Sequence, residues 1–159
     1  MKEFAVVLHN IRSMYNVGSI FRTADALSAS GLYLCGITPK PVDVWGKYRR
    51  EISKVALGAE KNLKWEYSYS TLNVLKKLKS NGYKILALEQ SPKSIFYYQF
   101  YPKKFSKIAL ILGNEKNGIP PKILNFSDFV LEIPMLGKKE SLNVSVAFGV
   151  VGFYLRYNK

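Results

Sequence analysis

Residues of types that suit catalysis or ligand binding occur in three stretches of this 159-residue sequence. The first stretch has an amide and a guanidinium, at Asn16 and Arg22, and the second has the carboxylate of Glu115. The third has Ser141 and Asn143 directly before a long apolar run. Free backbone N–H groups at the start of a helix favour an anion or a bound ligand. The third stretch is therefore an expected ligand site.

Several common catalytic patterns are absent from the sequence. Residues 113–118 have the GxxxxG spacing, but Ile119 and Pro120 follow where a P-loop requires Lys and Ser or Thr, and no GxGxxG occurs. No metal site is expected, because the only His and the only Cys, His9 and Cys35, lie far apart in the sequence. Nothing places a serine beside His9, which is interpreted as a polar residue at a strand end. These absences disfavour a nucleotide-dependent enzyme, a metalloenzyme and a Ser-His hydrolase.

Each polar group also has a purely structural interpretation. Asn16 can cap a helix, and Arg22 can form a salt bridge with Asp25. Glu115 can be a solvated turn residue, and Ser141 can be the N-cap of the last helix. Taken one by one, these structural roles are the more frequent ones.

The spacing of apolar residues predicts the elements that position these groups. Strands are expected at 3–8, 31–37, 65–67, 83–88, 107–112 and 129–133. Helices are expected from an N-cap at Asn16, at 50–59, 71–80 and 121–125, and at the C-terminal end. This alternation predicts one domain over residues 1–159 with an α/β fold, in which a mostly parallel sheet has helices on both faces. Ligands of such sheets bind beyond the carboxyl ends of the strands, here in the loops at 88–92, 113–120 and 134–142.

The charge balance predicts a polyanionic partner. The sequence has 24 Lys and Arg against 11 Asp and Glu, a formal net charge of +13. Basic residues alternate with tyrosines, as expected where phosphates and exposed bases are held. The segment that we expect to contact RNA contains Lys47, Arg49, Arg50 and Lys54. The alternative is a solvated, lysine-rich surface, because a high pI alone carries no specificity.

The remaining bulk features predict a cytoplasmic protein. No apolar run reaches the ~20 residues that span a bilayer, and residues 1–10 show no signal-peptide pattern. One cysteine cannot form an internal disulfide, so a reducing compartment is expected and Cys35 is interpreted as a core residue.

The last helix has two distinct faces in the sequence. An apolar stripe is formed by Val144, Ala147, Phe148, Val151 and Leu155, and a stripe of small residues by Ser145, Gly149 and Gly152. A helix with an apolar stripe and a stripe of small residues is expected to be buried on two sides, which predicts close packing against a second chain. The facing small surface is expected at Gly18, Ala26 and Ala29 of the first helix.

Three segments together carry a family resemblance. They are HNIRSMYNVGSIFRTADA (9–26), IALILGNEKNGIP (108–120) and IPMLGKKESLNVSVA (133–147). In order and spacing they resemble the three motifs of the SpoU/TrmH branch of SPOUT RNA methyltransferases. The resemblance implies methyl transfer from S-adenosylmethionine to a ribose 2'-hydroxyl of RNA. It also implies a homodimer and a C-terminal trefoil knot.

The resemblance assigns expected roles to individual residues. The catalytic residues are Asn16, Arg22, Glu115, Ser141 and Asn143. The cofactor site is formed by Leu88, Gly113, Ile133, Met135, Ser141 and Leu142. RNA contacts are expected at Arg12 and Arg22 in addition to the basic segment. Because a guanidinium is effectively always protonated, we expect Arg22 to hold a phosphate and stabilise the forming alkoxide rather than act as a base.

Two classes of RNA are expected as targets. tRNA is favoured, since the smallest members that the chain resembles act on tRNA, and ribosomal RNA is the main alternative. A non-catalytic RNA-binding or assembly factor on the same fold is a further alternative, as is an enzyme acting on a small anionic substrate. Neither a metal ion nor a membrane is expected as a partner.

Overall fold

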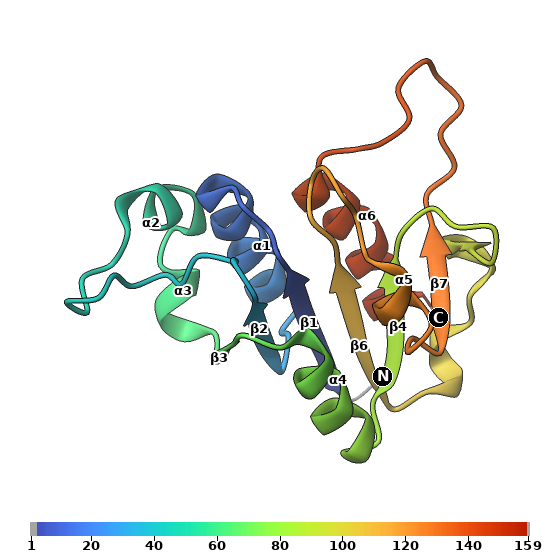
Figure 1. Ribbon diagram of the computed structural model, residues 1–159, viewed down its shortest axis with the longest axis horizontal. Coiled ribbons are helices and arrows are strands. Elements are labelled where there is room, and N and C mark those ends of the chain that lie inside the picture. Colours follow the sequence, from blue (N-terminus) through green and yellow to red (C-terminus); the bar gives the residue numbers. More distant parts are fainter. Residues whose placement is uncertain (1–2, 159) are drawn as a thin grey trace.

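The computed structural model describes residues 3–158, and these form a sheet of seven strands with helices on both faces (Figure 1). The strands are β1 (Glu3–His9), β2 (Gly31–Cys35), β3 (Trp65–Ser68), β4 (Lys84–Leu88), β5 (Ile95–Phe96), β6 (Lys107–Leu112) and β7 (Phe129–Glu132). The α-helices are α1 (Met14–Ala26), α2 (Arg50–Ala56), α3 (Ala59–Asn62), α4 (Thr71–Ser80), α5 (Pro121–Leu124) and α6 (Val144–Tyr157). Two 3₁₀ turns, η1 (Tyr97–Gln99) and η2 (Pro102–Lys104), lie between β5 and β6.

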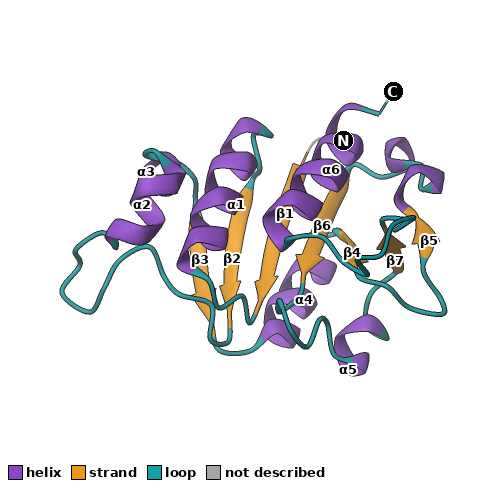
Figure 2. Cartoon of the chain, turned by 90° about the horizontal axis from the view of Figure 1, so that it is seen from above, coloured by secondary structure: helices purple, strands orange, loops and turns teal. Residues whose placement is uncertain are grey.

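All neighbouring strands are parallel, in the order β3-β2-β1-β6-β4-β7-β5. Helices α1, α2, α3 and α6 lie on one side of the sheet, and α4 and α5 on the other (Figure 2). The predicted α/β class, with a parallel sheet between two helical layers, is therefore confirmed. The trefoil knot stays a prediction.

Side-chain alternation in the strands explains the two helical layers. Phe4, Val6 and Leu8 of β1 are buried in one core cluster with residues of α1 and α6. Ala5 and Val7, which point to the opposite face, are buried with residues of α4 and α5. A strand buried on both faces has an almost unbroken apolar sequence, as β1 and β6 have.

The order of the strands brings three loops together. Strand β4 lies between β6 and β7, so the residues that follow Leu88, Leu112 and Glu132 meet at one edge of the sheet. Ligands of open α/β sheets bind beyond the carboxyl ends of the strands, which is where these three loops lie.

The N-cap of α1 was predicted wrongly. The helix begins at Met14, and Ser13 is its cap, because the Ser13 hydroxyl accepts a hydrogen bond from the Asn16 backbone N–H at 3.3 Å. The side chain of Asn16 is thereby available for contacts with other segments. At α6, the alternative that Ser141 is the cap is also wrong. The cap is Asn143, whose side-chain oxygen accepts from the Ser145 N–H at 2.9 Å.

The helix expected at 50–59 is divided in two. Leu57 has φ 53° and Gly58 has φ 94°, both in the left-handed region, so α2 ends at Ala56 and α3 begins at Ala59. The apolar stripe of α6 is largely as predicted, since Phe148, Val151 and Leu155 are fully buried.

Two of the small residues expected to face a second chain instead face their own chain. A Cβ on Gly152 would lie 2.8 Å from Leu27 Cδ1, and one on Gly18 would lie 2.6 Å from the Ile52 oxygen of α2. These glycines let helices of the same subunit approach closely, so that part of the prediction is wrong. The exposed stripe of α6 is apolar and contains Val146, Val150, Phe153 and Tyr157.

Candidate functional site

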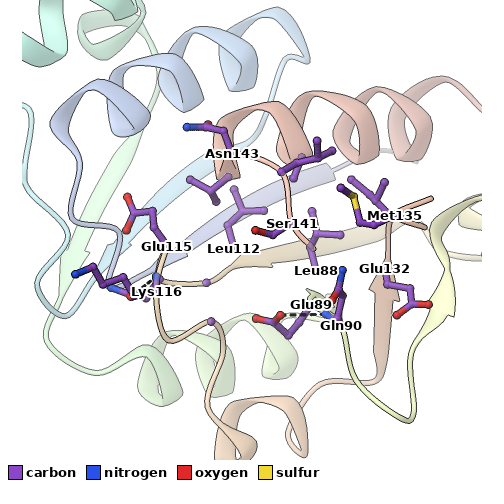
Figure 3. Close-up of a pocket in the computed structure, with 17 residues that line it drawn as sticks. Leu88, Glu89, Gln90, Leu112, Glu115, Lys116, Glu132, Met135, Ser141 and Asn143 are labelled. Atoms are coloured by element: carbon purple, nitrogen blue, oxygen red, sulfur yellow. Dashed lines mark hydrogen bonds between the residues drawn. The ribbon is translucent and has the colours of Figure 1, made fainter. Parts of the chain in front are cut away.

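A cavity of about 460 Å³ lies at the carboxyl ends of β4, β6 and β7 (Figure 3). Its walls come from the loops after these strands and from the start of α6. The lining residues are Leu88, Glu89, Gln90, Leu112, Gly113, Asn114, Glu115, Lys116, Gly118, Glu132, Ile133, Met135, Ser141, Leu142, Asn143, Val144 and Ala147.

The structure brings most of the predicted site residues to this cavity. Every residue predicted to hold the cofactor lines it: Leu88, Gly113, Ile133, Met135, Ser141 and Leu142. Of the predicted catalytic residues, Glu115, Ser141 and Asn143 line it as well. Segments from three distant parts of the sequence thus converge on one site.

The loop after β6 is held in a tight turn by Asn114. Its side-chain oxygen accepts from the backbone N–H groups of Lys116 and Asn117 at 2.9 and 3.0 Å, and its amide donates to the Asn10 carbonyl at 2.6 Å. Gly113 is required at the start of the turn, because a Cβ there would lie 2.6 Å from Ile119 Cγ1. The turn presents Glu115 toward α1.

Glu115 joins this loop to the start of α1. Its carboxylate accepts hydrogen bonds from the backbone N–H groups of Arg12 at 3.1 Å and Ser13 at 3.2 Å, and from the Asn16 amide at 3.0 Å. Partial burial raises the pKa of Glu115, but these hydrogen bonds and one from its own backbone outweigh it, and the pKa lies below its ordinary value. Glu115 is therefore an ionised acceptor at neutral pH.

Asn16 lies between Glu115 and Asn143. It donates to Glu115 and accepts from the Asn143 amide at 3.1 Å. Asn143 in turn accepts from the hydroxyl of Ser145 at 2.7 Å. One hydrogen-bonded chain therefore crosses all three stretches that the sequence singles out, although Asn16 itself is not part of the cavity wall.

Arg22 is placed differently from the other predicted catalytic residues. It is exposed on α1 and does not line the cavity of its own chain. Within residues 3–158, no ion pair joins Arg22 to Asp25, so the alternative that Arg22 forms a salt bridge with Asp25 is not supported. Asn16 and Arg22 are six residues apart, which at ~100° per residue puts them on different sides of the helix.

Two carboxylates of the cavity were not predicted. Glu89 follows β4 and accepts from the Ile119 N–H at 2.8 Å, and Glu132 ends β7 and accepts from the Ser94 hydroxyl at 2.6 Å. Together with Glu115 they give the cavity several acidic groups, against one lysine, Lys116. Their position at strand ends next to the predicted loops is the signal that marks them in the sequence.

The predicted RNA-contacting residues lie mostly at the surface. Lys47, Arg50 and Lys54 are exposed, whereas Arg49 is half-buried at the N-cap of α2 and its Nε is buried without a hydrogen-bond partner. The contact of these four basic residues with RNA stays a prediction, and Arg49 is the least accessible of them. This segment lies apart from the cavity, on the opposite half of the sheet (Figure 1).

A second cavity of about 460 Å³ adjoins the loop after β6 and is lined by Arg12, Lys116 and His9, among others. His9 ends β1, as expected, and its Nδ1 lies 2.8 Å from the Thr71 hydroxyl. Burial lowers the pKa of His9, so the ring is neutral at pH 7.

No cluster of three or more metal-ligating side chains occurs within residues 3–158. Over the same residues, no helix has the length and apolar character needed to cross a membrane.

Fold and site together define a class of protein: a parallel α/β sheet with a ligand cavity at the carboxyl ends of adjacent strands, of the kind that holds small organic ligands. The model of the SpoU rRNA Methylase family matches residues 3–153. The chain therefore belongs to this family, as its three motifs predict.

Relatives and solved structures agree with this assignment. The chain is 32% identical over 146 residues to the 23S rRNA (guanosine-2'-O-)-methyltransferase RlmB of Neisseria meningitidis, a match that covers 92% of the chain and 55% of that protein. It is 30% identical over 154 residues to the tRNA (guanosine(18)-2'-O)-methyltransferase of Aquifex aeolicus, with 94% and 67% covered. The crystal structure of an AdoMet-bound rRNA methyltransferase from Sinorhizobium meliloti superposes with a TM-score of 0.88 at 28% identity, over 98% of this chain and 56% of that one.

The chain spans about half to two thirds of the length of these curated relatives. A structure described as giving insights into the 2-OH methylation of C/U34 on tRNA is closer in size. The chain covers 94% of it at a TM-score of 0.79 and 24% identity, which supports the shared fold.

Proposed function

We propose that the protein methylates a ribose 2'-hydroxyl of RNA with S-adenosylmethionine as the methyl donor. The observation that carries this proposal is the convergence of Glu115, Ser141 and Asn143 with the six predicted cofactor-binding residues on one cavity. Membership of the SpoU rRNA Methylase family and the 2'-O-methyltransferase names of the relatives support the same reaction.

The cavity suits S-adenosylmethionine in size and chemistry. A volume of about 460 Å³ lies in the range of small-molecule sites. Leu88, Ile133 and Leu142 provide apolar surface for a purine ring. The carboxylates of Glu89 and Glu132 are suited to hydroxyl or ammonium groups. When bound, the cofactor supplies a methyl group on an electrophilic sulfonium.

The residues of the chain orient the reacting groups. Glu115, held ionised, fixes Asn16 by accepting its amide, and Asn16 fixes Asn143. Positioning of this kind can supply much of the rate enhancement when one group transfers directly to another. Asn143 and Ser141 face the cavity and are the groups of this chain that would orient the ribose.

The protein acts as a homodimer in this proposal. The exposed stripe of α6, with Val146, Val150, Phe153 and Tyr157, is the proposed contact surface. A dimer also gives a role to Arg22, which is absent from the cavity wall of its own chain but lies on the exposed side of α1. Arg22 would then hold an RNA phosphate at the cavity of the partner subunit.

tRNA is the proposed substrate, with ribosomal RNA as the alternative that the similarity to RlmB favours. The proposed setting is the cytoplasm. Mass-spectrometric mapping of ribose methylation in RNA from cells with and without the gene tests both substrates. A 2'-O-methyl group that disappears from one tRNA nucleotide is the expected result. Loss from ribosomal RNA alone would select the alternative, and unchanged methylation of both would contradict the function.

A further inference from the structure

The connection between β2 and α2 contains a small hydrogen-bonded hairpin, residues 41–49. Val42 and Tyr48 form an antiparallel bridge, and the Arg49 N–H donates to the Pro41 carbonyl at 2.8 Å. At the tip, the Asp43 carboxylate accepts from the backbone N–H groups of Trp45 and Lys47, each at 2.9 Å. The turn is thus fixed by its own hydrogen bonds.

The geometry of the tip presents Trp45 outward. Gly46 donates its N–H to the Asp43 carbonyl at 3.2 Å and has φ 78°, as in a type I turn followed by a left-handed residue. Trp45 is 82% exposed, and within residues 3–158 no ring packs against it. Figures 1 and 2 show the hairpin projecting from the end of the molecule opposite β7.

The surroundings of the tip are basic. Lys47, Arg50 and Lys54 are exposed on the hairpin and the start of α2. Lys61 of α3 lies 5.2 Å from the centre of the Tyr48 ring. The Asp43 carboxylate, which would repel a phosphate, is engaged by two backbone N–H groups. An exposed aromatic face with cations around it matches the needs of a nucleic acid base and its flanking phosphates.

We propose that Trp45 stacks on an unpaired base of the RNA substrate, while Lys47 and Arg50 contact the adjacent phosphates. This inference rests on the proposed function, and it specifies a structural feature of the substrate, an unpaired nucleotide that binds at the hairpin. The exposed apolar side chains of the hairpin are Val44, Trp45 and, in part, Tyr48, which together are far too small for a stable protein interface. Because the hairpin is held by its own hydrogen bonds, little conformational entropy is expected to be lost on binding.

The test measures binding of a fluorescently labelled tRNA transcript and of a fully paired RNA duplex of similar length by anisotropy. Trp45→Ala is compared with Trp45→Phe, which keeps a ring. Val44→Ala is the matched control, because Val44 is also 82% exposed but has no π face. Thermal unfolding and S-adenosylmethionine titration establish that each variant is folded.

Trp45→Ala is expected to weaken binding of the transcript about tenfold and to leave duplex binding unchanged. Trp45→Phe and Val44→Ala are expected to bind like the unchanged protein. Because Trp45 carries no charge, its loss leaves the slope of log K against log salt concentration unchanged, whereas Lys47→Ala lowers that slope by roughly 0.7 to 0.9. RNA is also expected to quench tryptophan fluorescence in the unchanged protein but not in Trp45→Phe.

Three results would overturn the inference. The first is equal transcript binding by Trp45→Ala and the unchanged protein while methylation continues, which leaves the proposed function intact. The second is an equal loss with Val44→Ala, and the third is an equal loss on the duplex. An unchanged protein that neither bound nor methylated either RNA would instead contradict the proposed function itself.

Discussion

The side-chain amide of Asn143 donates a hydrogen bond to the side-chain oxygen of Asn16 at 3.1 Å, although 127 positions separate the two residues. Asn16 also donates to the carboxylate of Glu115. Its single amide group therefore satisfies one partner with its oxygen and the other with its nitrogen. A carboxamide carries its donor and its acceptor on separate atoms, so at Asn16 each partner has an atom of its own.

Asn16→Asp is expected to lower the stability of the protein, although the two side chains have nearly the same shape. The new carboxylate still accepts from Asn143, but it faces Glu115 where a donor at 3.0 Å stood before. Like charges at that distance disfavour each other's ionisation, so the melting temperature falls and one of the two carboxyl pKa values rises.

Glu115→Gln in the same chain is expected to compensate in part, because its amide can donate to the carboxylate introduced at position 16, although the amide nitrogen no longer accepts from the Ser13 N–H. A double-mutant cycle followed by thermal unfolding is expected to give a favourable coupling of about 1 kcal/mol. Strictly additive effects of the two substitutions would contradict the proposed contact.

The Glu115 contacts are expected to make stability depend on pH. The pKa of Glu115 is lower in the folded protein than its ordinary value of 4.5. The contribution is therefore fully present above about pH 4.5 and is lost as the pH falls through the lower, folded value. Melting curves of the unchanged protein and Glu115→Gln should differ most above pH 4.5 and converge in more acidic solution. A constant difference from pH 7 to pH 3 would argue against an ionised Glu115.

Gly113→Ala is expected to destabilise the protein by about 1 to 3 kcal/mol, as overpacking does. The added methyl would lie 2.6 Å from Ile119 Cγ1 and 2.7 Å from the Gly118 carbonyl carbon. Gly137→Ala is the matched control, because a Cβ at Gly137 meets nothing within 4 Å. Chemical denaturation of both variants measures the difference. Equal stability of the two would show that the turn after β6 is not tightly packed.

Phe153→Glu is expected to convert the proposed dimer to a monomer, because it places a charge in the apolar stripe of α6. Ile37→Glu, also at an exposed apolar position but outside α6, is the control and should remain dimeric. Light scattering at micromolar concentration distinguishes the two states. Since the cavity includes the start of α6, the monomer is also expected to bind S-adenosylmethionine more weakly. A monomer of undiminished affinity would show that cofactor binding does not depend on dimerisation.

Mixing two inactive variants tests whether Arg22 acts across the dimer. Arg22→Ala and Asn143→Ala are each expected to lose methyl transfer. A heterodimer of the two contains one cavity with an intact Asn143 and an intact Arg22 from the partner. If subunits exchange freely, half of the dimers contain one chain of each variant, and each of these has one intact cavity out of two. Roughly a quarter of the activity of the unchanged protein is therefore expected to return. No recovery in a mixture shown to contain heterodimers would contradict this role of Arg22.

Much of the fold was predictable because its signals are local. The apolar runs of β1 and β6 and the motif residues at strand ends follow directly from the sequence, and they place the cavity. Ser13 and Asn16 are both good capping residues, so composition alone did not decide between them. Glu89 and Glu132 lie at strand ends beside the predicted loops, but both fall outside the three motifs, so the resemblance assigns them no role. The helical spacing places Gly152 on one face of α6, but it does not determine which helix packs against that face. In the structure it is the end of α1 in the same chain.

The cavity beside Asn143 is proposed to support ribose methylation. The most direct measurement incubates the purified protein with S-adenosylmethionine and unmodified tRNA or ribosomal RNA, followed by nucleoside mass spectrometry. We predict a 2'-O-methylated nucleoside with the unchanged protein and none with Asn143→Ala. A methyl group on a base, or no methylated nucleoside from a protein that binds both S-adenosylmethionine and RNA, would contradict ribose methylation at this cavity.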